Sequence, residues 1–163
     1  MIQANEPKKK ILFVCTGNIC RSPMAQAFLT RELEAYDLDS EFEADSAGVF
    51  AEAGHFSTLD AQQALEVLGV NDFSHFSQQV TRNMLKSSWL VLCMTNKHLA
   101  EVKRKWPDCT AYNFKTYLGL PGEVLDPYGQ GYHTYFDCAL EIEELVRTLV
   151  KYILKWKDRK PST

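Results

Sequence analysis

Hydrophobic residues along this 163-residue chain form short unbroken runs that alternate with longer amphipathic stretches. The unbroken runs are residues 11–15 and 89–94. Runs without intervening polar positions are typical of strands that are buried on both faces of a parallel sheet. Residues 42–47, which end at Gly48, and residues 110–114 predict two further short strands.

The amphipathic stretches predict helices. In residues 59–68 and 136–156 the apolar positions recur near the 3.6-residue period of a helix, and Gly69 follows the first stretch as a stop signal. The longer helix is expected to bury one face, made of Phe136, Leu140, Ile142, Leu145, Leu149, Tyr152, Ile153 and Trp156.

Local start signals predict the remaining helices. Ser22 followed by Pro23 predicts a helix with serine as its N-cap and proline at its first helical position. Thr81 is expected to cap a short helix, and residues 96–105 form another that ends before a proline. Residues 118–132, which are rich in glycine and proline, predict a loop.

Strands and helices therefore alternate along the chain, which predicts an α/β fold with a parallel sheet and right-handed crossovers. We find no internal repeat and no linker, so residues 1–163 are expected to form one domain, with flexible tails at 1–7 and 157–163. In such sheets ligands bind outside the carboxyl ends of the strands. Cys15 ends the first predicted strand, so the chemistry is expected there.

Composition restricts the class of protein. Hydrophobic residues make up 45% of the chain and charged residues 24%, which excludes collagen-like and largely disordered proteins. Five cysteines are an odd number and too few for a disulfide scaffold. The net charge of −3 lacks the basic surface of nucleic-acid-binding proteins. No apolar segment has the length of a signal peptide or a spanning helix, so we expect a cytoplasmic protein without nucleic-acid or membrane partners.

Residues 15–22 have the pattern C-x5-R-S between the first strand and the first helix, and we call this segment the anion loop. Gly17 allows positive φ and a close backbone approach, and Asn18 tolerates left-handed geometry. Successive N–H groups in such a turn form a nest for an anion, and the following helix adds the positive end of its dipole. The guanidinium of Arg21 can bind two phosphate oxygens, and the same positive field favours the nucleophilic thiolate of Cys15. The Ser22 hydroxyl can donate a hydrogen bond to that thiolate.

The segment VCTGNICRSPMA is very similar to the signature of the low-molecular-weight protein tyrosine phosphatases, in which it forms the phosphate-binding loop, or P-loop. The resemblance extends from Lys9 to about Trp156 and includes residues 45–48, 74–81 and 125–129. It implies a three-layer, flavodoxin-like fold with a four-stranded parallel sheet and flanking helices. It also implies hydrolysis of phosphotyrosine in proteins through a phosphocysteine, without a cofactor or metal ion.

The resemblance assigns roles to individual residues. Cys15 would be the nucleophile, Arg21 the phosphate ligand and Asp126 the general acid and base, since a leaving oxygen needs a proton. Substrate or phosphate would contact Thr16, Gly17, Asn18, Ile19, Cys20, Ser22 and Tyr128. Asn18, Ser46 and His75 match polar positions that hold the loop in shape, and Phe50 could form the wall opposite Tyr128.

Ile19 is the side chain most informative about the substrate. An apolar branched residue in the middle of the loop favours the flat ring of phosphotyrosine. Residues 77–79 and 94–95 resemble instead the protein-arginine phosphatases, a close branch that carries threonine where Ile19 stands. We weight Ile19 more because it would touch the substrate, and phosphoarginine stays as the alternative.

Other interpretations stay open at this point. The resemblance implies a reversible disulfide between Cys15 and Cys20, although Cys20 is equally explained as a small apolar residue. An arsenate reductase would need shuttle cysteines, and Cys109 and Cys138 lie far apart in the sequence. A module that binds phosphoproteins without turnover would not require the complete set of nucleophile, arginine and acid. The expected partners are phosphorylated proteins and, in the anion loop, inorganic phosphate or similar oxyanions.

Overall fold

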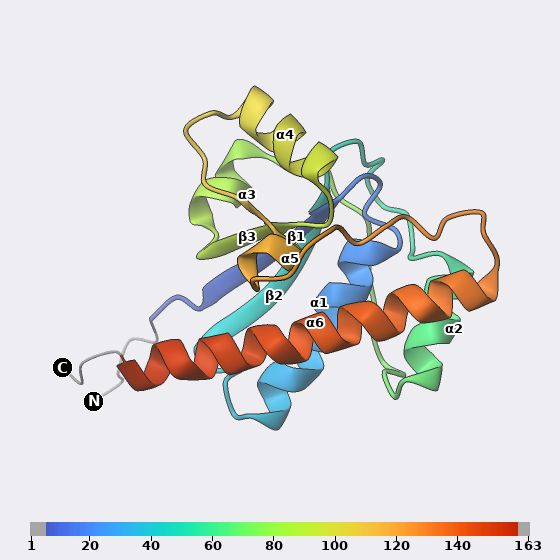
Figure 1. Cartoon of the computed structure of the whole chain (residues 1–163), viewed down its shortest axis with the longest axis horizontal. Helices are drawn as coiled ribbons and strands as arrows, with labels where there is room; N and C mark the ends of the chain where they lie inside the picture. The colour runs from blue at the N-terminus through green and yellow to red at the C-terminus, as the bar shows by residue number, and fades with distance from the viewer. Residues whose placement is uncertain (1–5, 160–163) are drawn as a thin grey trace.

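The computed structural model describes residues 6–159 and contains one four-stranded sheet, in which all the strands are parallel (Figure 1). The strand order is β2-β1-β3-β4. The strands are β1 (Lys9–Cys15), β2 (Phe42–Gly48), β3 (Leu90–Cys93) and β4 (Tyr112–Asn113). The α/β class and the parallel sheet predicted from the alternating pattern are confirmed.

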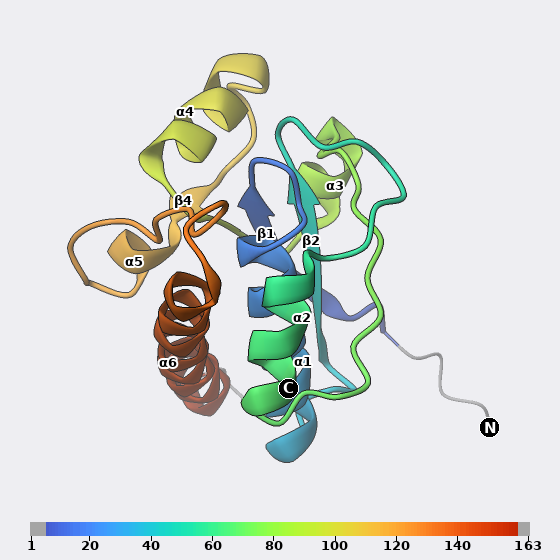
Figure 2. The same ribbon diagram turned by 90° about the vertical axis from the view of Figure 1, so that its right-hand side faces the viewer.

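Helices cover both faces of the sheet and complete the three layers. The helices are α1 (Arg21–Ala35), α2 (Leu59–Val67), α3 (Arg82–Ser87), α4 (Asn96–Lys105), α5 (Phe114–Tyr117) and α6 (Tyr132–Arg159). Side chains of α1, α2, α5 and α6 share one hydrophobic cluster, and α3 and α4 pack into the other. Figure 2 shows α1 and α6 side by side, in agreement with their contacts.

Strand β1 is the centre of the fold because its side chains supply both clusters. Ile11, Phe13 and Cys15 face the cluster of α1 and α6, whereas Leu12 and Val14 face the cluster of α3 and α4. This alternation follows from the two-residue period of a strand. A strand that is buried on both faces has an unbroken run of apolar residues, and this pattern predicted β1 from the sequence.

Several predicted boundaries differ from the structure. Helix α1 begins at Arg21 with Cys20 as its N-cap, so Ser22 does not cap the helix. The strand predicted over 110–114 is only Tyr112–Asn113, because the Asn113 side chain caps the short helix α5. Helix α6 continues to Arg159, so residues 157–159 of the predicted tail are helical. Residues 1–5 and 160–163 of the predicted tails lie outside the described residues.

The predicted buried face of α6 was partly wrong. Leu140 and Tyr152 are exposed, while Tyr135, Ala139 and Val146 are buried in their place. The helix contacts both α1 and α2, and its side chains share one hydrophobic cluster with β1, β3 and α5, so its buried face is wider than a single stripe. No helix among residues 6–159 has the length and apolarity needed to cross a bilayer.

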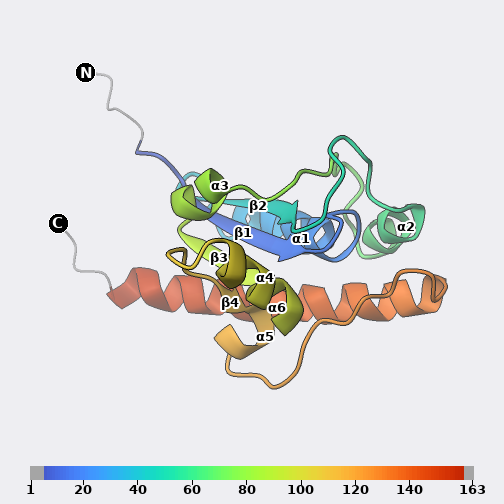
Figure 3. The same ribbon diagram turned by 90° about the horizontal axis from the view of Figure 1, so that it is seen from above.

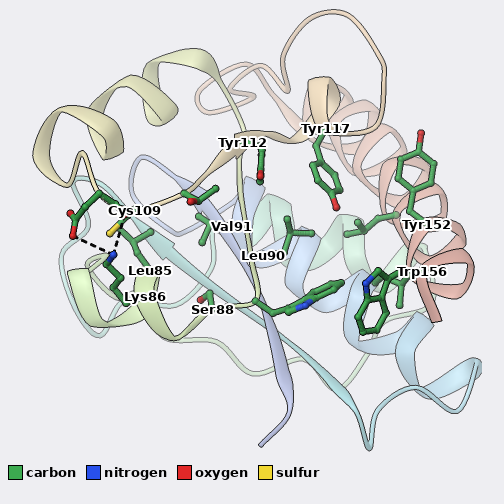
Figure 4. Close-up of a pocket in the computed structure, with 15 residues that line it drawn as sticks. Leu85, Lys86, Ser88, Leu90, Val91, Cys109, Tyr112, Tyr117, Tyr152 and Trp156 are labelled. Atoms are coloured by element: carbon green, nitrogen blue, oxygen red, sulfur yellow. Dashed lines mark hydrogen bonds and ion pairs between the residues drawn. The ribbon is translucent and has the colours of Figure 1, made fainter. Parts of the chain in front are cut away.

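A cavity of about 560 Å³ opens at the sheet edge beside the start of β3 (Figure 4). Five aromatic side chains line much of it: Trp89, Tyr112, Tyr117, Tyr152 and Trp156. At its other end Lys86 forms an ion pair with Asp108 at 3.2 Å. None of its described lining residues belongs to the anion loop.

Candidate active site

The anion loop starts at the carboxyl end of β1 and runs directly into α1, as predicted. The loop that follows β2 and the loop that precedes α6 lie at the same end of the sheet (Figure 3). Hydrogen bonds join both to the anion loop: for example, the Phe50 N–H donates to the Thr16 carbonyl at 3.0 Å, and Arg21 Nη1 donates to the Val124 carbonyl at 3.0 Å. Three segments far apart in the sequence therefore meet at one site.

Asn18 holds the loop in its shape. Its φ of +58° lies in the left-handed region that an asparagine tolerates, whereas Gly17 does not use the positive φ that is open to it. The Asn18 side chain donates to Ser22 Oγ at 2.9 Å and accepts from the Gln78 N–H at 3.0 Å. The Asn18 carbonyl accepts from His75 Nε2 at 2.7 Å. One asparagine thus fixes the left-handed turn from both its side chain and its backbone.

His75 has the supporting position that the resemblance implied. Burial lowers its pKa below the ordinary 6.5, so the imidazole is neutral at pH 7. A neutral ring carries one N–H, and the 2.7 Å contact with the Asn18 carbonyl requires that proton on Nε2. The histidine therefore acts as a fixed donor to the loop.

Cys15 lies at the bottom of the loop and is 1% exposed. Its Sγ is 2.8 Å from Ser22 Oγ. Because Asn18 already donates to that oxygen, the Ser22 hydroxyl proton is free to point at the sulfur. A hydrogen bond to sulfur stabilises the thiolate, which is the nucleophilic form. Ser22 thus contacts the sulfur from the first turn of α1, whose N-cap is Cys20.

Arg21 is buried, with 3% of the residue exposed. Its Nη1 binds the Val124 carbonyl, and its Nη2 lies 3.8 Å from Asp126 Oδ2. Its Nε is buried and has no hydrogen-bond partner among the described residues. A buried donor without a partner costs about 1–3 kcal/mol, a cost that a bound oxyanion would remove. The loop is therefore electrostatically suited to an anion, despite the net charge of −3.

Asp126 lies above the loop and is accessible, with 52% of its side chain exposed. Its Oδ1 accepts the Tyr128 N–H at 3.0 Å, an Asx turn that aims the carboxylate. This carboxylate and the anion loop line the same pocket of about 190 Å³. Its lining residues are Cys15, Thr16, Gly17, Ile19, Cys20, Arg21, Asp126 and Tyr128.

Cys20 is buried beside the nucleophile. Burial, with a smaller contribution from Cys15, raises the pKa of the Cys20 thiol well above its usual range. Its protonated Sγ lies 3.9 Å from Asp126 Oδ1. Cys15 and Cys20 are both free thiols in this structure, so the implied disulfide stays a prediction.

Ser46 does not contact the anion loop directly. Its hydroxyl donates to Gln26 Oε1 at 2.6 Å, and its carbonyl accepts from the Gln78 side chain at 2.8 Å. Gln78 in turn binds Asn18, so Ser46 acts one residue further from the loop than we expected.

Phe50 is also placed differently from the prediction. It lies outside the 190 Å³ pocket and lines a neighbouring cavity of about 600 Å³ together with Thr16, His98 and Asp126.

His98 is a site residue that the sequence reasoning missed. Its Nδ1 accepts from the Thr95 N–H at 3.2 Å, so Nε2 carries the proton and donates to Thr16 Oγ1 at 2.8 Å. Burial, with a smaller effect of Arg21, lowers the pKa of His98 to about 4, which keeps the ring neutral. The spacing of Thr95 and His98 is that of a capping box, and this signal was available in the sequence.

Gly48 allows the anion loop to pack against the end of β2. A Cβ atom at this position would lie 2.3 Å from the Thr16 carbonyl oxygen and 3.1 Å from the Asn18 nitrogen. The neighbouring Val49 N–H donates to the Cys15 carbonyl at 2.9 Å. The backbone of β2 can make this approach only because residue 48 has no side chain.

The cysteines outside the loop are poorly placed for a relay. Cys109 belongs to the hydrophobic cluster of α3 and α4, whereas Cys15 faces the other cluster, across the sheet. Cys138 packs against the cluster that contains Cys15. A shuttle that passes from Cys15 through both Cys138 and Cys109 would have to cross the sheet, which disfavours the arsenate reductase interpretation.

Comparisons with known proteins agree with this geometry. Residues 10–159 match the family model described as low molecular weight phosphotyrosine protein phosphatase. The chain is 38% identical to a protein-arginine-phosphatase of Bacillus subtilis, covering 89% of this chain and 97% of that one. It is 30% identical to a low molecular weight phosphotyrosine protein phosphatase of Schizosaccharomyces pombe, covering 88% and 96%. A solved arginine phosphatase, a cysteine-to-serine mutant with a phosphorylated active-site serine, aligns with a TM-score of 0.85 and 36% identity over 90% of this chain and 96% of that one.

Proposed function

This chain belongs to the low molecular weight phosphotyrosine protein phosphatase family, and from that premise we propose that it hydrolyses phosphotyrosine in proteins through a phosphocysteine on Cys15. One observation carries the proposal. The thiol of Cys15, the buried guanidinium of Arg21 and the accessible carboxylate of Asp126 line the same 190 Å³ pocket. These are the nucleophile, anion ligand and proton donor that such a reaction needs.

In the first step the Cys15 thiolate attacks phosphorus. An S–P bond forms while the bond from phosphorus to the tyrosyl oxygen breaks. Asp126 gives its proton to that leaving oxygen, so tyrosine departs neutral. The Arg21 donors and the loop N–H groups bind the phosphoryl oxygens, on which charge is concentrated in the transition state.

In the second step a water molecule attacks the phosphocysteine. The Asp126 carboxylate takes a proton from the water, the S–P bond breaks, and inorganic phosphate is released. The Ser22 hydroxyl, 2.8 Å from Sγ, stabilises the departing thiolate. The phosphoserine of the solved cysteine-to-serine relative supports a covalent intermediate at the corresponding position of that protein.

Substrate preference is proposed from the rim of the pocket. Ile19 and Tyr128 both line it, and their apolar surfaces suit a flat aromatic ring. Phosphoarginine is the second candidate, because a relative with 38% identity is named a protein-arginine-phosphatase. We further propose that the protein acts in the cytoplasm, where a nucleophilic thiol is kept reduced.

A parallel assay of matched phosphotyrosine and phosphoarginine peptides tests both candidates. We expect higher kcat/KM for phosphotyrosine, and we expect Ile19→Thr to lower the ratio of the two values. An unchanged ratio would remove Ile19 from the argument. Cys15→Ser should abolish turnover of both peptides and of an aryl phosphate, and near-full activity in that variant would refute the mechanism. EDTA should leave turnover intact, because the proposed steps use only side chains and backbone N–H groups.

Phosphotyrosine binding without release of phosphate by the wild-type protein would instead indicate a binding module. The assay therefore separates the catalytic and non-catalytic interpretations of the same pocket.

A further inference from the structure

Two large aromatic side chains next to the anion loop are exposed to solvent. Phe56 is 66% exposed and Phe76 is 58% exposed. Their ring centroids are only 5.1 Å apart, with an angle of 40° between the planes. Exposed phenylalanines are common singly, but a packed pair beside a functional pocket is typical of an interaction site. We call this pair the Phe56–Phe76 surface.

The two segments that carry the pair are firmly joined. The Ser77 N–H donates to the His55 carbonyl at 2.7 Å, and the His55 N–H donates to Ser77 Oγ at 2.9 Å. The Gly54 N–H adds a bond to the Ser77 carbonyl at 2.9 Å. Three hydrogen bonds, two of them between backbone groups, therefore hold together the two segments that carry the Phe56–Phe76 surface. Rigid aromatic side chains bind a partner with little loss of conformational entropy.

Both segments are also fastened to the anion loop. The Thr58 N–H donates to the Ile19 carbonyl at 2.8 Å, two residues from Phe56. His75, the residue before Phe76, donates to the Asn18 carbonyl at 2.7 Å. Two residues of extended chain span about 7 Å at most. Each phenylalanine thus lies one or two residues along the chain from a residue that is hydrogen-bonded to the anion loop, at Asn18 or Ile19.

We propose that the Phe56–Phe76 surface binds the substrate protein, and that it takes an apolar side chain close in sequence to the phosphorylated residue. The inference rests on the proposed function. A phosphorylated residue in the pocket brings its flanking chain near the anion loop, and the two exposed rings offer that chain an apolar surface. Packing an apolar side chain against the two rings removes apolar surface of both partners from water, which favours binding.

The double variant Phe56→Ala/Phe76→Ala tests this with three substrates. These are an aryl phosphate, a phosphopeptide with leucine on both sides of the phosphorylated residue, and the same peptide with serine in place of leucine. We expect kcat/KM for the leucine peptide to fall about tenfold, as for the loss of a binding hot spot. The serine peptide and the aryl phosphate should change less than twofold. Tyr36→Ala is the matched control, since Tyr36 is also an exposed aromatic (53%) but follows the far end of α1.

Three outcomes would overturn the inference. One is an equal loss on all three substrates, which would show that the pair only supports the anion loop. The second is no loss on the leucine peptide. The third is a change of oligomeric state alone: the wild-type protein sediments as a dimer, the double variant sediments as a monomer, and the peptide kinetics of the two are the same. That result would assign the surface to a second copy of the chain. Failure of the proposed function is distinct, because the wild-type protein would then turn over none of the substrates.

Discussion

The close approach of β2 to the anion loop makes Gly48→Ala a demanding test of the site. The added Cβ would lie 2.3 Å from the Thr16 carbonyl oxygen and 2.9 Å from the Ala51 Cβ, where ordinary contacts begin at 3.4 Å. The loop must therefore withdraw by about 1 Å, because strand β2 is fixed in the sheet. A displacement of that size lengthens the 3.0 Å bond from the Phe50 N–H to Thr16 and moves the backbone next to Cys15.

The expected cost has two parts. Overpacking typically destabilises a fold by about 1–3 kcal/mol, so the melting temperature should fall by about 4–8 °C for 2 kcal/mol. Misplacing a catalytic group by 1 Å lowers the rate about 100-fold. We therefore expect a folded protein whose kcat/KM for an aryl phosphate is reduced about 100-fold, measured by phosphate release alongside thermal unfolding.

Gly54→Ala, in the loop that follows β2, is a matched control. Its φ of +89° strains an L-residue, but a Cβ there meets nothing within 4 Å. We expect a comparable loss of stability, about 1–2 kcal/mol, with activity toward the aryl phosphate retained. The inference that the anion loop depends on close packing against Gly48 is wrong if Gly48→Ala keeps wild-type activity. It is also wrong if both variants lose activity in proportion to their loss of stability.

Asn18→Ala should lower kcat/KM by more than tenfold in phosphate-release assays, because it removes the side-chain bonds to Ser22 and Gln78; an active variant would show that other contacts hold the loop. Asp126→Asn should lower kcat about 10²–10⁴-fold for a tyrosyl leaving group and much less for an activated aryl leaving group, as measured by burst and steady-state kinetics. His98, whose pKa is lowered to about 4, contributes stability that is present above pH 6.5 and lost as the pH falls toward 4, because the unfolded chain binds the proton first. Urea unfolding at pH 7 and pH 5 should show this loss, at most about 3 kcal/mol over the whole range, and His98→Gln should reduce the pH dependence.

Local patterns were sufficient for much of the fold. The unbroken run at 11–15 identified β1 because burial on both faces leaves no polar position, and the helix expected over 96–105 has those bounds in the structure. The same reasoning failed where a side chain takes part in the site itself. Ser22 looks like a helix cap, but its hydroxyl is engaged by Cys15 and Asn18.

The candidate site was likewise predicted only where one local motif contains its residues. The C-x5-R-S spacing locates Cys15 and Arg21, because one loop contains both. The hydrogen bond from His98 to Thr16 joins residues 82 positions apart, and no pattern near Thr16 in the sequence predicts it. Ser46 was assigned to the loop, although Gln78 makes the direct contact with Asn18. Contacts between segments depend on how the strands are ordered in space, which short motifs do not encode.

The anchoring of the anion loop has a consequence for how the chain folds. Its partners lie far away in sequence: Asn18 binds residues 57 and 60 positions further on, and Arg21 binds a carbonyl 103 positions away. Contacts between residues so far apart in the sequence form only after the long segments between them have closed into loops. A nascent or partly unfolded chain therefore has Cys15 but no assembled anion nest, and nucleophilic reactivity at this cysteine reports that folding is complete. By mass action, any oxyanion that binds the nest stabilises the whole native state, by about 2.7 kcal/mol at 100 times its dissociation constant.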